Sequence, residues 1–193
     1  MKVISLFCGC GGMDLGLVKA GHEIVWANDN DEDSIRTYEN YFKVKLKHNK
    51  TIISLKDIKK VKTKDIPMAD VVVGGFPCQA FSVAGYQKGF EDKRGDVFFQ
   101  IIRLINELPK KPKVLLLENV KNIYTHDKKK TFRIIQDSLE KTGYCVFSKI
   151  MNTCEYTCVP QNRERTFIVC FLEEKNTFLD PSKPKSTYFE KVF

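Results

Sequence analysis

The sequence predicts an α/β fold: a mostly parallel sheet of seven strands, with helices on both faces and an antiparallel closing strand. Short apolar runs alternate with helical patterns along most of the chain, which is typical of strand–helix–strand units. The strand-like runs are continuously apolar, as strands buried on both faces are. The last two runs follow each other without a long helix between them, which indicates an antiparallel hairpin.

The first three strands lie in the N-terminal third of the chain. Residues 2–7, "KVISLF", form the first strand, and the helix after it ends at Gly21, a residue type that favours helix C-termini. Residues 23–28 form the second strand. Residues 31–42 begin with acidic side chains, which favour a helix N-terminus, and a short third strand follows at 51–55.

Four further apolar runs complete the sheet. They are residues 69–75, 113–120, 144–152 and 165–172. Two helical patterns, at 96–108 and 129–143, separate them. Because crossovers between parallel strands are right-handed, we expect a doubly wound sheet whose direction of growth reverses beside the first strand. Ligands of such sheets bind at the carboxyl ends of the strands, near this reversal.

Composition indicates one domain. The chain has 193 residues, 42% of them hydrophobic, and no apolar run approaches the ~20 residues of a membrane helix. The net charge of +8 favours a polyanionic partner, but frequent lysine throughout the chain explains it equally well.

The seven cysteines predict a reducing, cytoplasmic setting, because their number is odd and no leader precedes the first strand. The pairs Cys8/Cys10 and Cys154/Cys158 could suggest zinc, but their spacing and the absence of nearby histidines fit poorly. We expect buried thiols there and no metal.

A glycine-rich loop, "FCGCGG" (7–12), follows the first strand. Glycines permit a tight turn and a close approach of backbone to a ligand. The loop departs from the dinucleotide pattern G-x-G-x-x-G because Asp14 stands at the last position, where it would repel a pyrophosphate. Asp29, at the end of the second strand, is placed to hold a ribose diol, or alternatively to cap the next helix. Asp57, after the third strand, is a binding residue or a surface acid.

The fourth strand ends in "GGFPCQAFS" (74–82) and places a thiol, Cys78, at the working edge of the sheet. Glu118 supplies an acid at the end of the fifth strand. This pair suits addition of sulfur to an electron-poor ring whose nitrogen must be protonated. A thiol hydrolase would need a histidine base, and none of the three histidines follows a strand.

The segment "PQNRERTF" (160–167) precedes the last strand. In an extended segment Gln161, Arg163 and Arg165 would share one face. Paired arginines bind carbonyl oxygens or phosphate, although a solvated basic strand edge is the alternative.

These residues, in this order, resemble the carbon-5 cytosine-specific DNA methyltransferases over about residues 1–172. "SLFCGCGGMDLG" resembles the family's cofactor loop, "GGFPCQAFS" its nucleophile motif, "ENV" its acid motif and "QNRER" its arginine motif. The resemblance implies a Rossmann-like class I S-adenosylmethionine-dependent fold. It assigns residues 1–172 to a catalytic and cofactor-binding domain.

The resemblance also implies a cofactor site for S-adenosylmethionine. Phe7 would lie against the adenine, Asp29 would hold the ribose and Asp57 the adenine amino group. Asn30 stands where the family often has an aromatic residue. The implied cofactor-binding set is Phe7, Gly9, Gly11, Gly12, Asp29, Asn30, Asp57, Ile58, Pro77 and Val97.

The implied chemistry begins with addition of the Cys78 thiolate to carbon 6 of a cytosine flipped out of DNA. Glu118 would assist at ring nitrogen 3, and Arg165, or Arg163 as second choice, would bind the base carbonyl. Residues 80–95 would form a loop that closes over the base. The implied catalytic set is Cys78, Glu118, Arg165, Arg163, Asn119, Pro77 and Gln79.

Residues 173–193 form a polar C-terminal extension, too short for the family's target-recognition region. We therefore expect the catalytic subunit of a split restriction-modification methyltransferase, or a truncated one, in the cytoplasm and near the nucleoid of a prokaryote. Its partners would be double-stranded DNA and a subunit carrying recognition and the remaining C-terminal motifs. Basic stretches at 43–50, 59–64 and 126–130 would be solvated, or face that partner.

Three other functions stay open. An RNA (tRNA) cytosine-5 methyltransferase would use the same chemistry on folded RNA. A non-catalytic regulatory relic of the fold would not need the intact Cys78 and Glu118. A thiol redox protein would be expected to carry a C-x-x-C pair, which Cys78 does not have.

Overall fold

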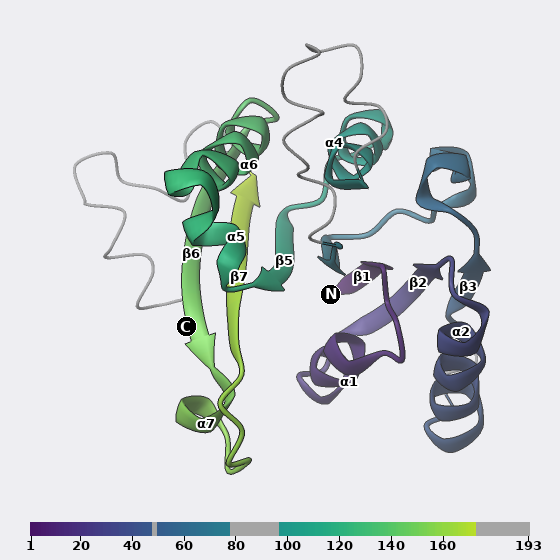
Figure 1. The fold of residues 1–193 in the computed structure, drawn as a ribbon. Helices are drawn as coiled ribbons and strands as arrows, with labels where there is room; N and C mark the ends of the chain where they lie inside the picture. Colours follow the sequence, from purple (N-terminus) through teal and green to yellow (C-terminus); the bar gives the residue numbers. More distant parts are fainter. Residues whose placement is uncertain (48–49, 78–96, 173–193) are drawn as a thin grey trace.

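Seven strands form one sheet in the order β3-β2-β1-β4-β5-β7-β6 (Figure 1). The computed structural model describes residues 1–47, 50–77 and 97–172. The strands are β1 (Lys2–Leu6), β2 (Glu23–Asp29), β3 (Ile52–Leu55), β4 (Val71–Gly75), β5 (Val114–Val120), β6 (Tyr144–Asn152) and β7 (Glu164–Leu172). Strands β1 to β5 pair in parallel, and β7 is antiparallel to both β5 and β6. The predicted seven-stranded doubly wound sheet with an antiparallel closing strand is confirmed.

Helices cover both faces of the sheet (Figure 1). They are α1 (Gly12–Lys19), α2 (Glu32–Glu39), the π-helix η1 (Asn40–Lys45), η2 (Ile58–Lys60), η3 (Thr63–Asp65), α4 (Val97–Glu107), α5 (Asn122–Thr125), η6 (His126–Lys129), α6 (Lys130–Glu140) and α7 (Thr153–Tyr156). Alternate side chains of each parallel strand enter two separate cores. One core contains residues of α4 and α6, and the other contains residues of α1, α2 and η1.

Most predicted boundaries differ from the structure by one to three residues, and two of the differences have a clear physical cause. The first strand ends at Leu6 rather than residue 7, because Phe7 adopts a left-handed backbone with φ 54° that turns the chain out of the sheet. The helix expected over 31–42 changes from α to π geometry at Asn40. The widened turn brings Phe42 into the second core, stacked on Tyr38 with ring centroids 4.2 Å apart.

The expectation of buried thiols in the two cysteine pairs is wrong for three of the four residues, and the fourth, Cys8, is only partly buried. Cys10, Cys154 and Cys158 are exposed. Cys154 lies on the short α7, and Cys158 on the turn after it, between β6 and β7, where residues 154–163 are exposed throughout. Within the described residues no group of three or more metal-binding side chains gathers. No helix in the same ranges is long and apolar enough to cross a bilayer.

Candidate active site

A cavity of about 310 Å³ lies at the carboxyl ends of the central strands, where the sheet reverses its direction of growth. Strands β1, β4, β5 and β7, the loop after β1 and the start of α1 all contribute lining residues. Its lining residues are Ser5, Leu6, Phe7, Cys8, Met13, Asp14, Gly74, Gly75, Glu118 and Phe167. The cavity is therefore at the predicted switch point between β1 and β4.

The glycine loop is held to the end of β2. The backbone N–H of Cys8 donates to the Asn28 carbonyl at 3.0 Å, and the N–H of Gly9 donates to Asp29 Oδ2 at 2.8 Å. The other oxygen of Asp29 accepts from the N–H groups of Asn30 and Asp31, at 2.8 and 3.0 Å. Asp29 thus fixes the loop against β2.

Helix α2 is capped by a different aspartate. Asp31 accepts from the backbone N–H of Ser34 at 2.7 Å. Hydrogen bonds from the side chain of Ser34 and from its backbone lower the pKa of the Asp31 carboxyl. The N-cap residue of α2 is therefore Asp31, while Asp29 accepts from the two N–H groups directly before the helix. Asn30 is exposed beside it.

The glycines of the loop differ in what a side chain at each position would contact. Gly11 has φ 86°, and a Cβ there would lie 2.3 Å from Phe42 Cε2, so its side chain is excluded by packing on the aromatic pair. A Cβ at Gly9 or Gly12 would meet no described atom within 4 Å. The surface at Gly9 and Gly12 is thus open to a ligand, whereas Gly11 serves the core.

Asp14 is the most enclosed polar group of the site, with 1% of its surface exposed. One carboxylate oxygen accepts from Ser5 Oγ at 2.6 Å and the other from the Tyr38 hydroxyl at 2.8 Å. Burial raises the pKa of Asp14, and these two hydrogen bonds oppose the rise. The same burial, with the charges of Asp14 and Asp29, raises the pKa of Cys8, so that thiol stays protonated at neutral pH.

Glu118 and Arg165 meet at the cavity. Arg165 Nε lies 3.1 Å from Glu118 Oε1, and each side chain is only about a fifth exposed, 23% and 22%. Gly75 stands opposite Glu118 in the parallel register, and a Cβ at Gly75 would lie 3.2 Å from Glu118 Oε2. The absent side chain at Gly75 therefore leaves room for the carboxylate.

Asn119 is buried next to Glu118 and ties two strand ends together. Its Nδ2 donates to the Phe76 carbonyl at 2.8 Å, and its Oδ1 accepts from the N–H of Val120 at 2.8 Å. Phe76 packs on Phe98 of α4, with ring centroids 5.4 Å apart. Asn119 thus fixes the exit of β4, directly before Pro77.

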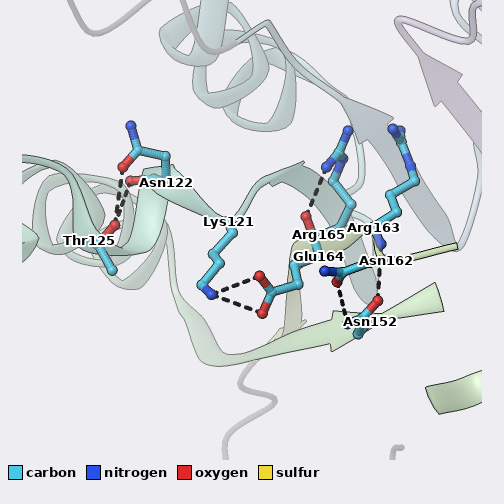
Figure 2. Close-up of polar contacts among 8 residues, drawn as sticks. All are labelled: Lys121, Asn122, Thr125, Asn152, Asn162, Arg163, Glu164 and Arg165. Carbon is cyan, nitrogen blue, oxygen red and sulfur yellow. Dashed lines mark hydrogen bonds and ion pairs between the residues drawn. The ribbon is translucent and has the colours of Figure 1, made fainter. Parts of the chain in front are cut away.

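The arginine segment is only partly as predicted. Figure 2 shows the side chains of Arg163 and Arg165 extending to the same side, while Glu164 reaches Lys121 with a nitrogen–oxygen distance of 2.7 Å. Gln161 precedes β7, and its carbonyl accepts from the N–H of Arg163 at 3.0 Å, which makes a tight turn. One extended face shared by all three residues is therefore wrong, because the strand begins at Glu164.

Of the predicted adenine-binding residues, Phe7 lines this cavity, whereas Asp57, Ile58 and Val97 follow β3 or begin α4 and lie outside its lining. Asp57 accepts from the N–H of Lys59 at 2.9 Å and so caps η2, and Ile58 is 4% exposed in the core. Arg103 of α4 donates to the carbonyls of Ile58 and Val61 at 3.0 and 3.2 Å. Val97 packs partly buried against the same core.

The C-5 cytosine-specific DNA methylase family matches residues 1–192 of the chain. This chain belongs to that family. The chain is 48% identical to type II methyltransferase M.Bsp6I of Bacillus sp. (strain RFL6), over 89% of this chain and 52% of that protein. It is 40% identical to M.HhaI of Haemophilus parahaemolyticus, over 91% of this chain and 50% of that protein. The chain thus spans about half the length of these relatives.

Solved structures of other methyltransferases have the same fold. The Dnmt2 methyltransferase of S. pombe matches with a TM-score of 0.68 at 22% identity, over 92% of this chain and 51% of that one. The methyltransferase EhMeth of Entamoeba histolytica matches with a TM-score of 0.68 at 21% identity, over 96% and 57%. The Rossmann-like fold expected from the sequence is confirmed.

For a cytosine methylase the described cavity has a suitable charge. Its lining contains two carboxyl groups, Asp14 and Glu118, and no lysine, arginine or histidine. A cofactor with a positive sulfonium and no phosphate, such as S-adenosylmethionine, fits this lining, whereas a pyrophosphate does not.

Several residues of the methylase site carried no signal that sequence reasoning could use. Ser5, Tyr38, Gly75 and Phe167 contribute through contacts between distant strands and helices. Asp14 was noted from the sequence as a departure from the dinucleotide pattern, but not as a binding residue. Cys78, Gln79, the 80–95 loop and the 173–193 extension lie outside the described residues.

Proposed function

We propose that this chain is the catalytic part of an enzyme that transfers a methyl group from S-adenosylmethionine to carbon 5 of cytosine in DNA. The observation that carries the proposal is Glu118, which lines a cavity beside the glycine loop and is paired with Arg165 at 3.1 Å. Family membership and similarity to type II methyltransferases support it.

The cofactor would lie along the carboxyl ends of the strands. Bound there, S-adenosylmethionine supplies an electrophilic methyl group on a sulfonium. We assign its binding to Phe7, Gly9, Gly12 and the acids at the ends of β2 and β3, Asp29 and Asp57. The site would be completed by Gly11, Asn30, Ile58, Pro77 and Val97. Gly11 would contribute indirectly, because its missing side chain leaves room for Tyr38 and Phe42.

Cys78 would start the reaction by adding its thiolate to carbon 6 of the flipped base, which places electron density on carbon 5. Glu118 would protonate, or hydrogen-bond to, ring nitrogen 3, so that negative charge does not build up on the ring. After methyl transfer, loss of the carbon-5 proton and expulsion of the Cys78 thiolate restore the aromatic base. Gln79 would help to shape the base pocket.

Arg165 would serve both the acid and the base. Its Nε pairs with Glu118 Oε1, which orients the carboxyl group, and its guanidinium would also bind the base carbonyl oxygen. Arg163 extends to the same side and is the second choice for that contact (Figure 2). Asn119 would hold Phe76 and Pro77, the residues directly before Cys78, in place through its hydrogen bond to the Phe76 carbonyl.

We propose that recognition of a base sequence and the family's remaining C-terminal motifs come from a region outside these residues, on a partner subunit or in a longer form of the same polypeptide. Sequence reading in the major groove needs side chains carried on such a region. The chain matches about half the length of the curated relatives. Because the proposed substrate is DNA, we also propose that the enzyme acts at the nucleoid.

The test is a trapping experiment. The chain, with and without a candidate partner, is incubated with S-adenosylmethionine and DNA containing 5-fluorocytosine, whose fluorine blocks the final proton loss. We expect a covalent protein–DNA adduct that maps to Cys78 by mass spectrometry and is absent in Cys78→Ser. An adduct at another residue would overturn the proposal. An adduct that forms with tRNA but not with DNA would also overturn it.

A further inference from the structure

The cavity holds one carboxyl group that the proposed chemistry does not use. Glu118 has a role and a cationic partner, Arg165. Asp14 lines the same cavity with 1% of its surface exposed, and within the described residues it forms hydrogen bonds but no ion pair. An unpaired carboxyl group so deeply buried is costly, which calls for a compensating role.

The fold is built to keep this group in place. Ser5 of β1 and Tyr38 of α2 each donate a hydroxyl to one oxygen of Asp14. Tyr38 reaches it because Gly11 has no side chain: a Cβ there would lie 2.9 Å from the tyrosine ring. Hydroxyl donors on both oxygens stabilise the ionised form of a carboxyl group.

We propose that Asp14 determines specificity for the charge of the ligand: its carboxylate favours the positively charged methyl donor over the neutral thioether left after transfer. The inference rests on the proposed function and extends it. The donor carries a sulfonium, and transfer of the methyl group removes that positive charge. A fixed negative charge that is part of the cavity wall therefore loses an attraction at the moment of transfer, which promotes release of the product.

A structural role of Asp14, as a tie between β1 and α2, makes a different prediction. Asn in place of Asp keeps the size and can still accept from one hydroxyl and donate to the other, so the tie survives while the charge is removed. Phe in place of Tyr38 removes one hydrogen bond and keeps the charge. The two variants separate charge from hydrogen bonding.

The experiment is isothermal titration of the full chain at about pH 8 with S-adenosylmethionine, S-adenosylhomocysteine and the analogue in which a protonated amine replaces the sulfonium. We expect Asp14→Asn to weaken binding of both cationic ligands relative to the thioether. The affinity ratio should fall on the order of tenfold, as for two unit charges about 12 Å apart at an effective dielectric constant of about 20. Tyr38→Phe should leave the ratio within about twofold of the wild type.

An unchanged ratio in Asp14→Asn, or an equal fall in Tyr38→Phe, overturns the inference. If Asp14→Asn does not melt cooperatively, Asp14→Ser removes the same charge and takes its place, with the same expected fall. A wild-type chain that binds none of the three ligands overturns both this inference and the proposed cofactor. If Asp14→Asn lowers the affinity ratio but no Cys78 adduct forms with DNA, the role of Asp14 is supported and only the proposed methyl-transfer chemistry is contradicted.

Discussion

At the scale of single residues, the acid of the site depends on its neighbours. Glu118 is oriented by Arg165 at 3.1 Å and accommodated by Gly75, whose Cβ would lie 3.2 Å from Oε2. A carboxyl group that must deliver a proton to a ring nitrogen needs this degree of orientation. The ion pair with Arg165 and the small residue Gly75 therefore both determine the orientation of the Glu118 carboxyl group.

Replacing Glu118 by Gln should slow adduct formation at Cys78 by about 10²- to 10⁴-fold, the usual contribution of a positioned acid. Single-turnover trapping on 5-fluorocytosine DNA measures this. Glu164→Gln is the matched control, because Glu164 is the neighbouring exposed acid and pairs with Lys121. Equal losses in both variants would mean that Glu118 acts only through local charge.

Asp14 should make the stability of the fold depend on pH. Burial raises the pKa of Asp14 above its ordinary value of 3.8, so the folded state holds this proton more tightly than the unfolded state does. Stability then falls as pH rises from about 3.8 through the folded pKa. Asp14→Asn does not titrate, and it should gain about 1 to 3 kcal/mol over the wild type at neutral pH.

Urea unfolding at about pH 4 and pH 8 checks this, with a small difference expected at the lower value and the full difference at the higher one. Asp33→Asn is the control, because Asp33 is exposed at the start of α2. A gap between the wild type and Asp14→Asn that stays constant with pH would contradict the expectation.

At the scale of elements, α4 holds the loop after β3. Arg103 donates to the carbonyls of Ile58 and Val61, and its other nitrogens contact Gln100 and Glu107 at 2.7 and 2.9 Å. The loop it holds contains Asp57 and Ile58, which we assign to the adenine. Helix α4 therefore positions one end of the proposed cofactor site.

Arg103→Met should weaken binding of S-adenosylhomocysteine about five- to tenfold and destabilise the fold by about 1 to 3 kcal/mol. The Val61 carbonyl loses the Arg103 donor, and the Ile58 carbonyl keeps the N–H of Val61, at 3.3 Å, but loses Arg103. Binding by calorimetry and unfolding by urea give the two numbers. Arg36→Met is the control, since Arg36 forms only an exposed pair with Asp33. Normal ligand affinity in Arg103→Met would mean that the loop at Asp57 and Ile58 keeps its binding conformation without the hydrogen bonds from Arg103.

At the scale of the whole molecule, the sheet brings Asp29 and Glu118, two residues of the proposed site, to one edge, and recognition of bases is proposed to lie outside these residues. The chain alone should therefore show weak or no sequence-specific methylation of DNA. Adding a recognition subunit should raise the rate by at least about 10²-fold, the order attributed to positioning a reactant. Transfer of labelled methyl groups to duplex DNA measures this.

The control for the mixture is Cys78→Ala in this chain, which should abolish the gain if the added subunit supplies recognition and not catalysis. Robust, sequence-specific methylation by the chain on its own would show that recognition is already present. Methylation of tRNA but not DNA by the mixture would move the substrate assignment to RNA.

The order of the strands could be predicted because it follows from local patterns and handedness. Continuous apolar runs identified strands such as Val71–Gly75, and right-handed crossovers placed β1 beside both β2 and β4. Glu118 and Asp29 could be named as site residues because parallel strands end at one edge of the sheet. Their chain positions alone therefore determined that they share an edge.

The contacts within that edge were decided by the tertiary structure. Register across the sheet sets Gly75 opposite Glu118, and side chains from distant elements meet only once the layers pack, as Asp14 meets Tyr38. The turn at Gln161 likewise interrupts an extended face that alternation alone favoured. Sequence patterns report which way a side chain faces within its own element. They do not report which partner from another element fills the space in front of it, and the chemistry of the site depends on those partners.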